Sequence, residues 1–277
     1  MNRSESVSGT RTVRAEVNYV SASTERPRFY ANDHSRDALP LDPRQVDICD
    51  ARTLPTQPTL AQEGIELLPF PASIANWRDT EELTQSYLPQ VRAFMLAVTG
   101  ADDVVVMGRA VLRFSERSAE AGKHDNSMVA RFIHIDVSDS ASRSFAQQMA
   151  PPGRAVRRSS QHNIWRTFSG APQDVPLAVC DARTVAAHVL VPADSVFDTP
   201  GQPEWSFESL LVRYDPSHRW LYYSNMQPEE ALVFKRHDTD SAQPCYVPHT
   251  AFWDSSVPEE AIPRASVEAR SVAYWFE

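Results

Sequence analysis

The stretch Val129-Ala-Arg-Phe-Ile-His-Ile-Asp-Val137 decides the expected fold, because it has the composition of a β-strand and carries two residues of the metal-ligand type. Side chains alternate between the two faces of a strand, so His134 and Asp136 share one face and the isoleucines beside them take the other. Burying the Asp136 carboxylate is costly unless a cation accompanies it. A metal ion would supply that cation. The alternative is a surface strand with Asp136 in water.

A candidate third ligand is His249, in Pro248-His-Thr-Ala-Phe252 at the start of another strand-like run. Two histidines and one carboxylate can occupy one side of an iron(II) ion and leave the other side open for substrate and oxygen. The chain has 8 histidines, and four of the others lie in loops or turns, where an exposed or structural imidazole is expected: His34, His188, His218 and His237. The predicted metal ligands are therefore His134, Asp136 and His249.

The most regular helical pattern runs from Asp79 to Val98. Asp79 suits the positive N-terminal end of a helix, and Gly100 suits its stop. The apolar residues recur at spacings of three and four and form one stripe: Leu83, Tyr87, Val91, Phe94, Met95 and Val98. We expect this helix to cover one face of a sheet. A second, short helix is expected from Ser140 to Met149, capped by Asp139 or Ser140.

Most of the remaining pattern is of the β type. The segment Asn32–Leu60 is rich in Asp, Arg and Pro and is expected to be loop with at most one short strand, and Asp215-Pro-Ser-His218 is expected to be a hairpin turn. The predicted strands are Val13–Val20, Pro27–Tyr30, Ile65–Phe70, Val104–Phe114, Val129–Val137, Pro176–Asp181, Ser209–Tyr214, Arg219–Ser224, Ala231–Lys235, His249–Trp253 and Ser266–Phe276.

Helices do not alternate with these strands, which disfavours a parallel α/β fold. The predicted class is mainly β (α+β), a double-stranded β-helix of the jelly-roll, cupin-like type with a covering helix. Residues 1–12 are polar and are predicted to be disordered. Residues 13–277 are predicted to form a single domain, with an N-terminal extension and the covering helix in 13–100 and the β core in 101–277.

Composition limits the partners and the compartment. The chain of 277 residues has 27 Lys+Arg against 36 Asp+Glu, a formal charge of −9, which argues against a nucleic-acid partner. No apolar run approaches the roughly 18 residues of a membrane span. The three cysteines are far apart and are expected to be reduced thiols, and a zinc role for Cys245 lacks the accompanying pairs. We expect a cytoplasmic protein. The sequence does not indicate an oligomeric state.

Several blocks, spread in order over residues 100–277, resemble the AsaB-like hydroxylase/desaturase family, which groups proteins similar to gibberellin desaturase and the cephem-methoxylase accessory protein. The first 100 residues fit this family less distinctly. The blocks are Ile133-His-Ile-Asp136, His162-Asn-Ile-Trp-Arg166, Pro176-Leu-Ala-Val-Cys-Asp-Ala-Arg183, His218-Arg-Trp-Leu-Tyr-Tyr223, Glu229-Glu-Ala-Leu-Val-Phe-Lys235, His249-Thr-Ala-Phe252 and Pro263-Arg-Ala-Ser-Val-Glu-Ala-Arg270.

The resemblance implies a non-heme Fe(II)- and 2-oxoglutarate-dependent oxygenase that uses O2 in natural-product biosynthesis, with iron on the three predicted ligands. In the double-stranded β-helix of such enzymes, an arginine early on the last strand meets the far carboxylate of 2-oxoglutarate, with a hydroxyl two residues later on the same face. Arg264 and Ser266 match that arrangement. Arg270 shares the face and is the second choice for the cosubstrate, or a substrate contact. The family usually has Glu at the position of Ala265, which is expected to point outward.

Three residues of the block Asn163-Ile-Trp-Arg166 are candidates for the substrate-binding wall. Trp165 could pack over the cosubstrate or substrate, and Arg166 could meet an acidic substrate group. The alternative is a core tryptophan with a surface arginine. The expected partner is a small-molecule substrate that is hydroxylated, desaturated or cyclised with release of succinate and CO2. A catalytically inactive accessory protein, or an iron oxygenase that does not use 2-oxoglutarate, stays open.

Overall fold

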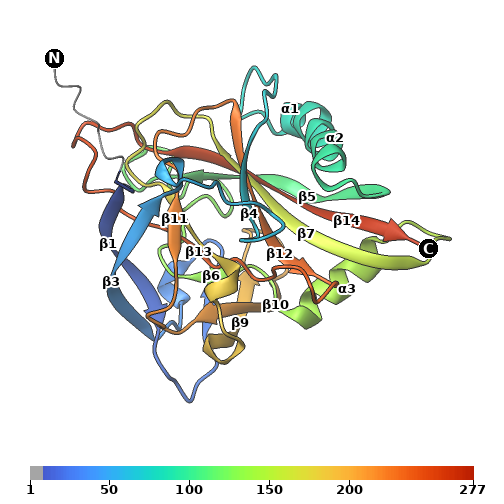
Figure 1. The fold of residues 1–277 in the computed structure, drawn as a ribbon, viewed down its shortest axis with the longest axis horizontal. Coiled ribbons are helices and arrows are strands. Elements are labelled where there is room, and N and C mark those ends of the chain that lie inside the picture. The colour runs from blue at the N-terminus through green and yellow to red at the C-terminus, as the bar shows by residue number, and fades with distance from the viewer. Residues whose placement is uncertain (1–8) are drawn as a thin grey trace.

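The computed structural model describes residues 9–277, and most of them belong to two β-sheets (Figure 1). Within this range the larger sheet has nine strands, in the order β1 (Thr12–Val20), β3 (Leu41–Asp50), β11 (Trp220–Tyr222), β8 (Leu177–Cys180), β13 (His249–Ala251), β6 (His134–Ile135), β10 (Trp205–Val212), β9 (Leu190–Phe197) and β2 (Arg28–Tyr30). The smaller sheet, within the same residues, has five strands, in the order β4 (Ile65–Pro69), β12 (Glu230–Asp238), β7 (Val156–Thr167), β14 (Ala265–Phe276) and β5 (Asp103–Phe114).

The two sheets pack face to face. Trp165 and Phe234 of the smaller sheet share one buried cluster with Val179 and Leu221 of the larger sheet. We call the side of the smaller sheet that meets the larger one its inner face, and the opposite side its outer face. Strand pairing in the smaller sheet is antiparallel throughout. The molecule is therefore mainly β and of the jelly-roll type, as the sequence predicts.

A helical segment covers the outer face of the smaller sheet, on the side of β5 and β14 in Figure 1. It consists of α1 (Thr80–Glu82), a π-helical turn η3 (Leu83–Tyr87) and α2 (Leu88–Thr99). The Asp79 carboxylate accepts the first free N–H groups, and Gly100 ends the helix with φ 61°. The stripe residues Leu83, Tyr87, Val91 and Met95 are buried against Ile164 and Val233. The predicted covering helix is confirmed.

The strand around the His-x-Asp motif is shorter than predicted, since only β6 pairs regularly and the run Val129–Val137 is otherwise irregular. The alternation still holds. Ile133 and Ile135 are fully buried in the core of the larger sheet, whereas His134 and Asp136 line the space between the sheets. The Ile133 N–H donates to the Asn18 carbonyl, so β1 supports the segment where regular pairing ends.

The predicted hairpin at Asp215–His218 is wrong. The turn forms, with the Asp215 carboxylate accepting from the Ser217 N–H, but the flanking strands do not pair. β10 pairs with β6 and β9, and β11 pairs with β3 and β8, so three strands separate them in the sheet. Each strand finds its partners among distant segments, and a local turn signal carries no information about those partners.

Three long strands were not predicted: β7, β9 and the ten-residue β3, which lies in the expected loop Asn32–Leu60. In β7 buried polar side chains break the apolar pattern, whereas in β3 and β9 a proline and charged residues outside the core hide the alternation. The second helix, α3 (Asp139–Met149), begins one residue earlier than expected, and its cap is the Ser138 hydroxyl. Short 3-10 turns lie in the connections: η1 (His34–Arg36), η2 (Ala51–Thr53), η4 (Ala182–Thr184) and η5 (Ala187–Val189). The expected disorder of residues 1–12 falls mainly on residues 1–8, outside the described part, and β1 already includes Thr12.

Candidate metal centre

Neighbouring strands of the larger sheet bring His134 and His249 side by side, because β13 pairs with β6 in a register that sets these two residues opposite each other. The Asp136 carboxylate completes the group. Its Oδ1 lies 3.6 Å from His134 Nε2 and 3.7 Å from His249 Nε2. One ligand-type atom of each residue lies within 4.8 Å of the other two. The sequence-predicted trio is thus gathered at one point.

The protonation of the two imidazoles follows from their backbone contacts. His134 Nδ1 lies 3.0 Å from the Phe132 carbonyl and His249 Nδ1 lies 3.2 Å from the Val247 carbonyl. A carbonyl only accepts, so each Nδ1 carries the N–H, and Nε2 of each ring is the atom available to a metal ion. Burial, followed by the neighbouring His249, lowers the pKa of His134 to about 3, which keeps that ring neutral at ordinary pH.

Nε2 of His134, Nε2 of His249 and Oδ1 of Asp136 therefore face one another. A buried carboxylate oxygen at 3.6 and 3.7 Å from two imidazole nitrogens is favoured by a cation beside it, and a metal ion can supply that cation. A divalent transition metal takes this mixture of imidazole and carboxylate, and the backbone contacts of both Nδ1 atoms orient the rings for it. The donor set fits a metal ion.

The second oxygen of Asp136 is held by the smaller sheet. Asn163 Nδ2 donates to Oδ2 at 2.7 Å, and Arg236 Nε lies 3.1 Å from the same oxygen. Burial alone would raise the pKa of Asp136, but Arg236, His249 and Arg270 outweigh it and hold this pKa well below its usual range. The carboxylate is ionised, and its Oδ1 is kept turned toward the histidines.

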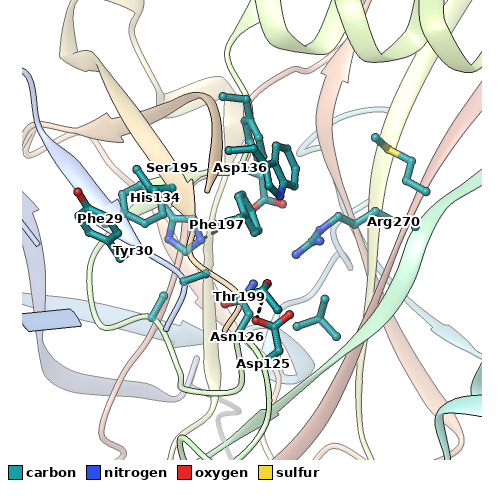
Figure 2. A pocket seen from close by; sticks show the side chains of 18 of the residues that line it. Phe29, Tyr30, Asp125, Asn126, His134, Asp136, Ser195, Phe197, Thr199 and Arg270 are labelled. Carbon is teal, nitrogen blue, oxygen red and sulfur yellow. Dashed lines mark hydrogen bonds and ion pairs between the residues drawn. The ribbon is translucent and has the colours of Figure 1, made fainter. Parts of the chain in front are cut away.

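A cavity of about 470 Å³ opens beside this group, between the two sheets. His134, Asp136 and Arg270 line its inner part, as Figure 2 shows, with Phe29, Tyr30 and Phe197 on the wall beside β2 and β9. The volume is that of a typical small-molecule site. The pocket gives a small molecule access to the open side of the three-residue group.

The inner part of the pocket is rich in guanidinium groups. Arg236 pairs with Asp136, and Arg270 pairs with Glu268 at 2.6 Å. Arg113 donates from Nη1 to three neutral oxygens, those of the Asn126 side chain and backbone and of the Met128 backbone. All three arginines line the pocket. They make its inner end electropositive.

Arg264, the residue before β14, and Ser266, near the start of that strand, lie outside the residues that line the pocket. Both are buried, and the alternation predicted for residues 264, 266, 268 and 270 on the inner face is observed. Arg264 Nη1 donates to the Val175 carbonyl at 2.8 Å, and its guanidinium lies over the Trp165 ring at 5.4 Å. Among the residues described, no carboxylate forms an ion pair with it. Burial lowers the pKa of Arg264 to about 9, and Arg113 acts in the same direction.

Strand alternation places the three predicted wall residues on two different faces of the smaller sheet. Asn163 reaches Asp136 from the inner face, so it contacts a candidate ligand and not the cavity. Trp165 is a buried core residue beneath Arg264. Arg166 points to the outer face, where its guanidinium lies 5.0 Å from the rings of both Phe70 and Trp77. The structure does not bring Arg166 to this site.

Sequence reasoning missed Arg113, Arg236 and Glu268. Arg113 interrupts an apolar run in β5. A charged residue in such a run indicates a cation with a functional role. Arg236 lay beyond the expected end of its strand, Ala231–Lys235, because the polar run Arg236-His-Asp238 has the composition of a loop. In the structure β12 continues through all three, and every one is buried. Their partners come from other strands, which a single segment cannot reveal.

Comparison with known proteins identifies the class. The chain belongs to the family described as the Oxidoreductase/YMDC permease-like domain, whose model matches residues 17–274. In the part of the chain from residue 9 onward, no helix has the length and hydrophobicity to cross a membrane.

Individual relatives sharpen this assignment. The chain is 26% identical to oxidoreductase clz16 of Cochliobolus lunatus over 91% of this chain and 93% of that protein. It is 34% identical to the hydroxylase/desaturase asaB of Aspergillus flavus over 41% of this chain and 54% of the relative. The resemblance to hydroxylase/desaturases is confirmed.

A solved structure matches the fold. The iron and alpha-ketoglutarate-dependent endoperoxidase NvfI superimposes with a TM-score of 0.83 and 23% identity, covering 97% of this chain and 100% of that one. The corresponding protein of Aspergillus novofumigatus, named Fe(II)/2-oxoglutarate-dependent dioxygenase nvfI, is 26% identical over 71% of this chain and 69% of its own length. The jelly-roll class is confirmed, and the chain is an oxidoreductase related to such dioxygenases.

Proposed function

We propose that this protein is a non-heme Fe(II)- and 2-oxoglutarate-dependent oxygenase that hydroxylates, desaturates or oxidatively cyclises a small natural-product intermediate, with release of succinate and CO2. The observation that carries the proposal is the meeting of three ligand-type atoms, two imidazole nitrogens and one carboxylate oxygen, beside a small-molecule cavity. The names of the relatives nvfI and asaB support the same chemistry.

Bound Fe(II) would activate O2 and thereby supply the oxidising power to remove a hydrogen atom from a C–H bond. The chain supplies the arrangement. His134 and His249 offer Nε2 atoms of rings fixed by backbone carbonyls, and Asp136 offers one ionised oxygen while Asn163 and Arg236 hold the other. The three ligands come from one side, so the opposite side faces the pocket.

For the cosubstrate we propose Arg264 with Ser266. Arg264 is buried, its Nε has no hydrogen-bond partner among the residues described, and its charge is not neutralised by an ion pair. A buried guanidinium of this kind suits the far carboxylate of 2-oxoglutarate, which would form a charge-assisted pair with it. Arg270, the second choice, lines the pocket and forms an ion pair with Glu268, whereas Arg264 has no carboxylate partner among the described residues.

Titration of 2-oxoglutarate into the Mn(II)-loaded protein tests this assignment, because Mn(II) occupies such sites without turnover. We expect Arg264→Met to weaken 2-oxoglutarate binding by at least about tenfold, the loss of a hydrogen-bonded charge pair. Arg166→Met removes an equally buried arginine from the outer face and serves as the matched control. Arg264→Lys keeps the positive charge and controls for a folding defect in Arg264→Met. It should recover only part of the 2-oxoglutarate affinity that Arg264→Met loses.

Succinate formation under air with Fe(II) completes the test. Metal binding without 2-oxoglutarate binding would favour an oxygenase that uses no 2-oxoglutarate, and absence of metal binding would favour an accessory protein. We also propose that residues 13–277 act as one domain, because the pocket draws residues from β2 to β14. A cytoplasmic location is proposed from the free state of Cys49, Cys180 and Cys245.

A further inference from the structure

An aromatic wall lines the pocket along β9 and β10. It consists of Phe197 at the end of β9 and of Trp205 and Phe207 on β10, and we call these three residues the aromatic wall. Phe197 stacks on Trp205 with ring centroids 4.5 Å apart and planes 16° apart, and on Phe207 at 5.4 Å and 23°. Phe145 of α3 meets Phe207 edge to face at 5.3 Å.

The wall is open on the pocket side. Trp205 is 54% exposed although it belongs to a stack of three rings that line a cavity. Exposed rings grouped in this way leave a contiguous apolar surface, which is a mark of a binding site and not of a random surface position. Trp253, 44% exposed, is not among the residues that line this cavity and provides an internal contrast.

The inner end of the pocket has one guanidinium more than its carboxylates neutralise. Arg236 has Asp136, Arg270 has Glu268, and at the rim Arg109 has Asp125. Arg113 has only neutral oxygens among the residues described. An Fe(II) ion and a 2-oxoglutarate dianion would cancel each other's charge, so this excess would persist in the loaded enzyme.

Arg270 is the arginine of β14 that lines the pocket. Its Nη2 pairs with Glu268, and its side chain is still 20% exposed. Figure 2 shows the side chain of Arg270 extending from β14 into the pocket toward Asp136. The exposed part of this guanidinium can pair with a carboxylate on a ligand in a charge-assisted interaction.

We propose that the substrate is a ring-bearing carboxylic acid, whose flat apolar part lies against the aromatic wall and whose carboxylate meets Arg270 in the field of Arg113. The inference rests on the proposed function for its assignment of the ligand as the substrate. Stacking on Trp205 and Phe207 accounts for the apolar half of the pocket, and the carboxylate balances the extra charge at the inner half. Trp205 and Arg270 are then the specificity-determining residues.

The test uses two probes of one shape, 2-naphthoate and 2-naphthalenemethanol, titrated by calorimetry into protein loaded with Mn(II) and N-oxalylglycine, a non-reacting analogue of 2-oxoglutarate. The analogue occupies the cosubstrate position, so that naphthoate cannot bind there. We expect 2-naphthoate to bind about tenfold more tightly than the alcohol, the difference between a charge-assisted and a neutral hydrogen bond.

Two variants separate the two halves of the proposal. Trp205→Ala should weaken both probes by about five- to tenfold, whereas Trp253→Ala, an equally exposed tryptophan elsewhere, should leave both unchanged. Arg270→Met should remove the preference for naphthoate and leave binding of the alcohol intact. Circular dichroism and thermal unfolding confirm that each variant is folded.

Equal affinity of the two probes for the unaltered protein would overturn the carboxylate assignment, and equal effects of Trp205→Ala and Trp253→Ala would overturn the wall. Weaker binding of N-oxalylglycine in Arg270→Met, with the preference for naphthoate unchanged, would assign Arg270 to the cosubstrate and contradict the proposal. Failure of the proposed function gives a different result, because Mn(II) would then not bind. Binding of the two probes to the aromatic wall could still be measured with the metal-free protein.

Discussion

His134 and His162 are both buried histidines, and burial lowers the pKa of each to about 3, yet they belong to opposite kinds of polar cluster. His134 lies between the sheets with Asp136 and His249, where three ligand-type atoms face each other. His162 lies on the outer face of the smaller sheet, one residue before Asn163, and its Nε2 contacts the Ser160 hydroxyl at 3.2 Å. A hydroxyl can donate or accept, so this contact satisfies Nε2, while Nδ1 of His162 is buried with no partner among the described residues.

The carboxylates of the two clusters also differ in how far cations of the chain neutralise them. On the outer face, Asp238 accepts from Arg158 at 2.6 Å and from Lys235 at 3.1 Å, so cations of the chain neutralise it. We call Ser160, His162, Lys235, Asp238 and Arg158 the outer cluster. At the candidate metal centre, Arg236 reaches only Oδ2 of Asp136, and Oδ1 faces Nε2 of His134 and Nε2 of His249. Burial and shifted pKa values alone do not mark a metal site, whereas a carboxylate oxygen that meets two imidazole nitrogens does.

Removing a ligand from the candidate metal centre should have the largest effect. We expect His134→Ala to weaken Mn(II) binding by at least about 100-fold, because the loss exceeds the 10- to 100-fold typical of residues that only support a ligand. His162→Gln is the matched control, a buried histidine of similar pKa in the outer cluster, and should change the affinity by less than about twofold. Calorimetry measures both. Equal losses in the two variants would abolish the distinction between the clusters.

The outer cluster should instead govern stability. Asp238→Asn leaves Arg158 and the buried Lys235 without their carboxylate, and we expect the free energy of unfolding to fall by about 3 kcal/mol. Denaturant titration of the metal-free protein measures this. Mn(II) affinity at a temperature where the variant is folded should equal that of the unaltered protein. A loss of metal affinity in Asp238→Asn would show that the two clusters are coupled.

Arg236 should affect metal binding to an intermediate degree. Arg236→Met keeps much of the side-chain volume and frees Oδ2 of Asp136 from its ion pair, so the carboxylate is less firmly turned toward the histidines. We expect Mn(II) affinity to fall about 10- to 100-fold, as for other groups that orient a ligand. The test contrasts it with Lys235→Met, the neighbouring residue of the outer cluster, which should lower stability and spare metal affinity.

The smallest expected effect is on the pH dependence of stability. Burial raises the pKa of Asp238, but Arg158 and Lys235 outweigh it and the net pKa is lowered in the folded protein. A carboxyl with a lowered pKa stabilises the fold above the pKa of the unfolded chain, and this contribution is lost as the pH falls below about 4. The stability difference between the unaltered protein and Asp238→Asn should therefore shrink on acidification. A constant difference between about pH 6 and pH 3 would contradict this account.

Much of the fold could be predicted from the sequence where the pattern is local. The helix over Asp79–Val98 has a cap, an apolar stripe and a glycine stop, and all three are observed. The grouping of His134, Asp136 and His249 could also be predicted, because two of them share a strand face and the third begins another strand. The predicted hairpin at Asp215–His218 failed, since the partners of β10 and β11 are distant in the chain.

The charged environment of the site could not be predicted in the same way. Arg236 stands in a run of charged or polar residues that has the composition of a turn, and only the pairing of this part of β12 with β7 makes it a buried strand. Alternation then decides that Arg236 reaches Asp136 while Lys235 joins the outer cluster. Such partners depend on which strands meet, and this is a property of the whole chain.

The central claim is that the three facing ligand-type atoms hold Fe(II) in a site that also takes 2-oxoglutarate. The most direct measurement is the absorption spectrum of the anaerobic protein with Fe(II) and 2-oxoglutarate. We predict a visible charge-transfer band that requires both additions and is absent in Asp136→Ala. The absence of a band in the unaltered protein, or a band of equal strength in Asp136→Ala, would contradict the claim.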